Sequence, residues 1–177
     1  ALPICREPLA CKAVTAYIPD NPDVYQFLTG IQYLNFIADI FEVPSRAEKI
    51  ARYAKAFELD GHLHELIGEY SHGMRQKLVI ISALIHAPKL LVLDEPFVGL
   101  DPIASHTLRG FMAEICAAGG AVFFSTHVLE VAQKLCNKIA IIRGGRLVAS
   151  GETDAVCGDR DLEEVFLELE RDSKEDA

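Results

Sequence analysis

Two adjacent carboxylates, Asp94 and Glu95, follow an apolar run at residues 90–93 and precede Pro96. The run predicts a buried strand, and in open α/β sheets ligands bind where such strands end. At that place Asp94 can hold the magnesium ion of a bound nucleotide, usually through water, and Glu95 can polarise the water that attacks the terminal phosphate. Two acids also mark the solvated end of many ordinary strands, so the pair needs support from its surroundings.

Ser71 and Gly73 stand at the start of a predicted helix that runs to about residue 87 and leads into this strand. A serine and a glycine there present a hydroxyl and unpaired backbone N–H groups to an anion such as a γ-phosphate. By itself this segment is an ordinary helix N-cap. Downstream, residues 99–102 (Gly-Leu-Asp-Pro) predict a tight turn, which alone would be a routine loop before the next helix.

His127 lies just past the end of another predicted buried strand, at residues 121–125. A lone histidine is more often structural than catalytic. This one is expected at the carboxyl edge of the sheet beside Asp94 and Glu95. From there it can hydrogen-bond a γ-phosphate or the attacking water.

The sequence of residues 1–70 indicates little β-structure. Residues 1–25 are irregular and rich in proline, with one short strand expected at 14–18. Residues 30–70 carry apolar residues at helical spacing and predict two helices, with Thr29 and Ser45 as their N-caps. This stretch is expected to form a small helical insert.

From residue 71 onward, helical and strand patterns alternate. Short apolar strands between helices predict an α/β fold with a largely parallel sheet. Gly144 and Gly145 separate two short strand-like runs and predict a hairpin. Further helices are expected at residues 103–116, 128–136 and 162–169.

Composition limits the class of protein. The 177 residues include 17 Lys and Arg against 26 Asp and Glu, for a formal net charge of −9. An acidic chain without a basic cluster is a poor candidate for binding nucleic acid, so no nucleic-acid partner is expected. The five scattered cysteines form no CxxC spacing, which favours a reducing compartment over a disulfide framework or a zinc site. No apolar run is long enough to span a bilayer, so a membrane would be met through a partner.

The segments named so far occur in one order along the chain. They resemble the signature motif, Walker B motif, D-loop and H-loop of ATP-binding-cassette (ABC) ATPases, and the ordered set is far more specific than any single match. The resemblance extends over nearly the whole chain. It implies a P-loop NTPase-like fold, with a mainly parallel sheet, helices on both faces and an inserted helical subdomain. The implied parts are a helical subdomain at 30–70, a catalytic α/β core at 71–150, and a C-terminal helix and tail at 151–177.

The resemblance also implies roles at the matching positions. Asp94 matches the magnesium-linked Walker B aspartate, Glu95 the catalytic glutamate, and His127 the switch histidine.

Three other residues match positions that act between subunits. Asp101 corresponds to the D-loop aspartate, which works across the dimer interface. Ser71 and Gly73 correspond to the signature residues that touch the nucleotide held by the opposite subunit.

The resemblance thus implies an ATP-binding and ATP-hydrolysing subunit that powers transport, with ATP and Mg²⁺ as cofactors. Its implied place is cytoplasmic, peripheral on the inner face of the cell membrane. The implied partners are a transmembrane permease subunit and a second ABC ATPase domain, identical or different. An ABC-type ATPase that works outside transport and a non-catalytic truncated module remain as alternatives.

The chain departs from the family pattern at the phosphate-binding loop. It contains no Gly-x-x-x-x-Gly-Lys-Ser/Thr motif, and none of its twelve glycines is followed by lysine. That loop supplies the backbone N–H cradle and the lysine charge that hold the phosphates. Because the first residues resemble what normally follows the P-loop helix, the loop is expected upstream of residue 1. The 177 residues alone are expected to be inactive.

Two further places differ from the common pattern. Asp20 stands where the family has the Q-loop glutamine; its carboxylate can still join metal coordination, or it belongs to a Pro/Asp/Asn turn with no role. The sequence segment around Asp20, residues 17–25, is similar to the corresponding segment of ABC proteins that serve bacterial ABC-2-type exporters. In the signature, His72 and Met74 replace glycine and glutamine, and His72 adds bulk near the expected phosphate.

Overall fold

The computed structural model describes the backbone of residues 4–175 and the side chains up to residue 169. The chain divides into two compact units, Ala1–Ser125 and Thr126–Ala177. The larger unit contains the strand that ends at Asp94.

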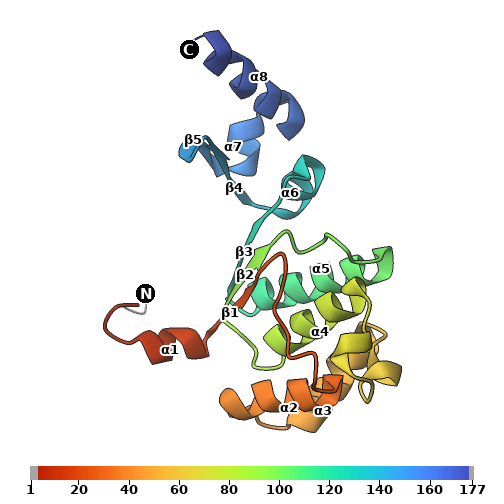
Figure 1. The fold of residues 1–177 in the computed structure, drawn as a ribbon. Coiled ribbons are helices and arrows are strands. Elements are labelled where there is room, and N and C mark those ends of the chain that lie inside the picture. Colours follow the sequence, from red (N-terminus) through yellow and green to blue (C-terminus); the bar gives the residue numbers. More distant parts are fainter. Residues whose placement is uncertain (1–3, 176–177) are drawn as a thin grey trace. The chain divides into compact units, whose positions relative to one another are not determined.

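The first unit is built on a three-stranded parallel sheet, which Figure 1 shows beside the helices of this unit. The strand order is β1 (Thr15–Ile18), β2 (Leu90–Asp94) and β3 (Ala121–Ser125), so that β2 lies in the middle. Parallel neighbours need long crossover connections, and helices provide them here. The predicted α/β class with a parallel sheet is confirmed.

The two faces of this sheet differ in burial, because successive strand side chains point to opposite faces. Ile18, Leu91 and Leu93 are at most 1% exposed and face the core. Helices α4 (His72–Leu84) and α5 (Pro102–Ala117) contact β1 and β3, respectively. On the alternate positions, Tyr17 and Phe123 are each 62% exposed, and both are in register with Val92 between them.

Two helices of the predicted insert pack against α4 and against each other. They are α2 (Gly30–Ile40) and α3 (Arg46–Ala56), followed by the short 3₁₀ helices η1 (Asp60–His62) and η2 (Ile67–Glu69).

Of the two predicted N-caps, Thr29 caps its helix and Ser45 does not. Thr29 is the expected N-cap of α2: its hydroxyl accepts from the backbone of Gln32, whose side chain accepts in return from the Thr29 N–H, a capping box. The predicted capping by Ser45 is wrong. Its φ of 51° is left-handed and its side chain caps nothing, because an N-cap needs extended backbone to aim its oxygen at the helix.

The proline-rich start is less irregular than predicted. Pro8–Ala13 form a helix, α1, in which Pro8 occupies the first turn. A proline there has its φ already set for a helix and gives up an N–H that would have had no partner. The predicted irregular stretch is therefore wrong at these six residues.

A histidine is enclosed where α4 meets the insert. The His86 ring stacks on Phe41, with centroids 3.9 Å apart, and both residues line a cavity of about 260 Å³. Within the described part of the chain, neither buried ring nitrogen makes a hydrogen bond of normal geometry. Burial lowers the pKa of His86 below 6.5.

We predict from this burial that acid destabilises the first unit. Because the pKa of His86 is lower in the folded state, its contribution to stability is complete at neutral pH and is lost as pH falls below about 6.5. We expect His86→Phe to flatten the fall in the free energy of unfolding between pH 7 and 5. Urea titrations followed by tyrosine fluorescence would measure this, since all five tyrosines lie in the first unit and the chain has no tryptophan. An equal fall in the wild type and the variant would contradict this assignment.

The described residues of the second unit, 126–175, form a hairpin and three helices. Strands β4 (Lys138–Arg143) and β5 (Arg146–Glu152) pair antiparallel around Gly144 and Gly145, whose φ values of 52° and 74° suit the tight turn. The predicted hairpin is confirmed. The helices are α6 (Leu129–Leu135), α7 (Thr153–Cys157), which was not predicted, and α8 (Leu162–Glu175).

A small core holds this unit together, centred on Ile141, Cys157, Leu162 and Val165. Across the described residues of both units, no helix combines the length and apolarity that a membrane span requires.

Candidate nucleotide site

Asp94 is fixed by the neighbouring strand. It is the last residue of β2 and is in register with Ser125, the last residue of β3, whose hydroxyl donates a hydrogen bond to Asp94 Oδ1. Both side chains offer the oxygen ligands that Mg²⁺ prefers. No group of three or more His, Cys, Asp and Glu suited to a metal is found among the described residues. One carboxylate nevertheless fits the magnesium of a nucleotide, because phosphates and waters supply the other ligands.

Glu95 leaves the strand in an uncommon backbone conformation. Its φ is 46°, in the left-handed region that few non-glycine residues occupy. Its N–H donates to the Ser125 carbonyl at 3.2 Å, and its own carbonyl accepts from Val98 N at 3.1 Å. Such conformations cost on the order of 1–3 kcal/mol and occur often at functional sites. The chain therefore turns sharply at the half-buried residue that follows Asp94.

The loop after Glu95 is held from two sides. Phe97 packs edge-on against Phe124 of β3, with ring centroids 5.9 Å apart. On the other side, a Cβ atom on Gly73 would lie 2.9 Å from the Gly99 carbonyl oxygen, and one on Gly99 would lie 2.6 Å from the His72 ring. The two glycines thus permit the start of α4 to touch the loop directly.

Ser71 is the N-cap of α4. Its Oγ accepts from Met74 N at 3.2 Å, as the sequence predicts. The preceding residue, Tyr70, is buried and donates its hydroxyl to the His62 carbonyl at 2.7 Å. Burial raises the pKa of Tyr70 to about 12. This anchor sets where α4 begins, and it leaves the first backbone N–H groups of the helix at its exposed end.

Asp101 begins the next helix. Its Oδ1 accepts from Ala104 N at 2.8 Å as the N-cap of α5, and its Oδ2 lies 2.6 Å from Lys77 Nζ on α4. The hydrogen bond from Lys77, together with that from Ala104, lowers the pKa of Asp101. The predicted D-loop aspartate is therefore bound within its own chain.

The two remaining predicted site residues, Asp20 and His127, lie just beyond the ends of β1 and β3. Asp20 is exposed, two residues beyond β1, at the same carboxyl edge of the sheet as Asp94. His127 lies two residues beyond β3 and belongs to the second unit.

Sequence reasoning missed two contacts of the site. The position of Ser125 at the end of a neighbouring strand could have indicated the first, its bond to Asp94. Nothing in the sequence pointed to the second, between Lys77 and Asp101.

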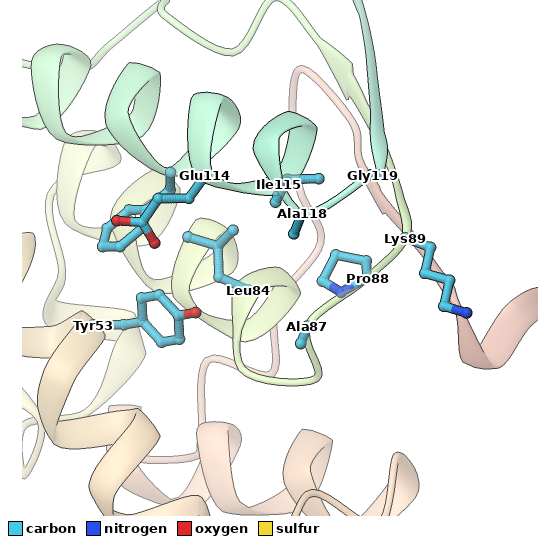
Figure 2. A pocket seen from close by; sticks show the side chains of 11 residues that line it. Tyr53, Leu84, Ala87, Pro88, Lys89, Glu114, Ile115, Ala118 and Gly119 are labelled. Carbon is cyan, nitrogen blue, oxygen red and sulfur yellow. The ribbon is translucent and has the colours of Figure 1, made fainter.

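A separate cavity of about 350 Å³ lies where β2 and β3 begin, away from these residues. Figure 2 shows Tyr53 and Leu84 on one side of it, with Ile115 of α5 and Ala118, the residue after that helix, above. Glu114 at its rim pairs with Arg52 at 2.9 Å. None of the predicted site residues lines this cavity.

Comparison with known proteins decides the family. Residues 15–131 match the family model described as "AAA domain, putative AbiEii toxin, Type IV TA system". The chain is 31% identical to the ABC-type transporter ATP-binding protein EcsA of Bacillus subtilis, over 97% of this chain and 71% of that protein. The chain belongs to the ABC transporter ATP-binding proteins. The family membership that the sequence indicated is thereby confirmed.

A second relative and a solved structure support the same family. An uncharacterized ABC transporter ATP-binding protein of Nostoc sp. is 35% identical over 87% of this chain and 47% of its own length. The solved "Structure of ATP binding subunit of ABC transporter" superposes with a TM-score of 0.87 at 32% identity, covering 94% of this chain and 72% of that one. The chain spans about half the length of several curated relatives that it matches. The P-loop NTPase fold expected from the sequence is confirmed by this structural neighbour.

Proposed function

We propose that this chain is the ATP-binding and ATP-hydrolysing part of a transporter subunit that acts through a separate transmembrane permease. The observation that carries the proposal is the pairing at the carboxyl edge of the sheet. Asp94 is fixed there by Ser125, and the left-handed Glu95 follows it directly. Family membership supports ATP as the nucleotide.

Each carboxylate has a distinct task in this proposal. Asp94 would hold the Mg²⁺ that accompanies ATP, and the ion would neutralise charge on the phosphates. Glu95, at the turn that directly follows Asp94, would orient and polarise the attacking water. Asp20 would reach the metal and His127 the γ-phosphate or the water.

A second ABC ATPase domain is part of the proposal. Ser71 and Gly73 present the positive end of α4 to an anion, which would be the nucleotide held by that second domain. Asp101 would stand beside the same contact. The pair of domains would work at the cytoplasmic face of the membrane, against the permease. The parts 30–70, 71–150 and 151–177 would serve as helical subdomain, catalytic core and C-terminal segment.

The 177 residues by themselves contain no P-loop motif. Without its N–H cradle and lysine, the triphosphate lacks most of its fixed donors, and Glu95 has no phosphate held in line for attack. We therefore propose that this stretch alone is inactive.

ATP binding and turnover test both statements. We expect the 177-residue chain to show neither, and a version preceded by an added segment that carries a P-loop to bind and hydrolyse ATP with Mg²⁺. Hydrolysis by the shorter chain would overturn the account of the phosphate site. An inert P-loop-bearing version that folds normally would favour a non-catalytic module instead.

A further inference from the structure

The ion pair between Lys77 and Asp101 differs from the exposed pairs of the described chain. The Lys77 side chain is only 13% exposed, against 71% for Lys134, whose pair with Glu130 has the same 2.6 Å separation. Exposed pairs contribute little, because solvent screens them and both side chains lose freedom. A largely buried lysine, in contrast, depends on its partner, since an unpaired charge there would be costly.

The pair joins two functional segments. Lys77 lies on α4, six residues after Ser71, and Asp101 ends the loop that begins at Glu95. Asp101 engages one carboxylate oxygen with Lys77 and the other with the first turn of α5. One carboxylate therefore ties together α4, the loop and α5.

A second contact joins the same two segments. The ring of His72 occupies the space beside Gly99, and the backbone of Gly73 approaches the Gly99 carbonyl. The start of α4 and the loop thus meet at two points, one ionic and one by close packing.

We propose that Lys77 is a positioning residue that, through Asp101, fixes the loop after Glu95 to the start of α4. The segment that would touch the second domain's nucleotide and the segment that carries the attacking-water residue then move as one body. The inference rests on the proposed ATPase function. It adds a residue that does not itself touch nucleotide.

The experiment has one arm that needs no ATP. The carboxyl titration of Asp101 is followed by NMR in the 177-residue chain, in wild type and in Lys77→Met, which keeps the aliphatic stem and removes the charge. We expect the titration midpoint of Asp101 to rise in the variant. An unchanged midpoint would overturn the ion pair and with it the proposal.

The second arm uses the P-loop-bearing version. We expect Lys77→Met to lower kcat by about tenfold with the KM for ATP unchanged, because misplacing a catalytic group costs rate rather than binding. Lys77→Arg should keep most of the rate. Asp101→Asn retains a capping oxygen and should match Lys77→Met, and the double variant should be no slower than either single one.

Lys134→Met is the matched control, since it removes a lysine from a pair of equal length on an exposed helix; its kcat should equal that of the wild type. A shifted Asp101 titration with unchanged kcat in Lys77→Met would show a purely structural contact and overturn the positioning role. An inert wild-type reference would overturn the proposed function and the positioning role together, while the NMR arm would still report the ion pair.

Discussion

Replacing Glu95 by glutamine is expected to slow ATP turnover by about 10²- to 10⁴-fold in the P-loop-bearing version, while ATP binding persists. Glutamine keeps the size of the side chain and loses the charge that polarises water. The N–H bond to Ser125 and the turn to Val98 involve only backbone atoms and should survive the substitution. The KM for ATP should therefore change little compared with kcat.

Steady-state hydrolysis and equilibrium binding of ATP would measure the two effects separately. Glu58→Gln is the matched control, because Glu58 is also a glutamate with left-handed backbone, at a φ of 54°, and is an exposed residue of the helical insert. Its turnover should equal that of the wild type. If Glu95→Gln kept turnover within about threefold of wild type, Glu95 would not be the general base.

Leu93→Ala is expected to have the largest effect on stability. Leu93 is 1% exposed and lies next to Asp94 on the central strand, so truncation leaves a cavity under the site. Deleting such a leucine costs about 2–5 kcal/mol, through lost burial and the cavity that remains. We expect urea denaturation followed by tyrosine fluorescence to show this loss.

The same strand offers a control for that variant. Leu90, at the start of β2, is 37% exposed, and Leu90→Ala should cost less than about 1 kcal/mol. Equal losses in the free energy of unfolding for the two variants would contradict the burial of β2 on a single face. The paired comparison also removes the intrinsic cost of alanine in a strand.

Local chemistry made part of the site predictable from the sequence. The run at 90–93 is apolar throughout, so a strand that ends at Asp94 and buries apolar side chains follows from composition. The prediction of a wholly buried strand is wrong at Leu90, which is 37% exposed. Ser71 and Thr29 precede helical patterns, and their hydroxyls satisfy N–H groups that every helix leaves open, wherever that helix packs. The order of the motifs depends on the chain alone, which is why the family could be inferred before the fold. The roles of Asp20, Asp101 and His127 stay predictions.

Other features depend on groups that are far apart in the sequence. Ser125 reaches Asp94 because β3 pairs with β2 in one register, and Lys77 reaches Asp101 because the fold brings α4 to the residue that caps α5. Ser45 illustrates the reverse: a residue type suited to capping was placed by its neighbours at a φ of 51°, where it cannot cap. The sequence by itself thus determined where β2 ends, where α2 and α4 begin and the order of the motifs, because these follow from local burial and hydrogen bonding. Only the tertiary structure decided which side chains meet, because those contacts depend on how distant elements pack.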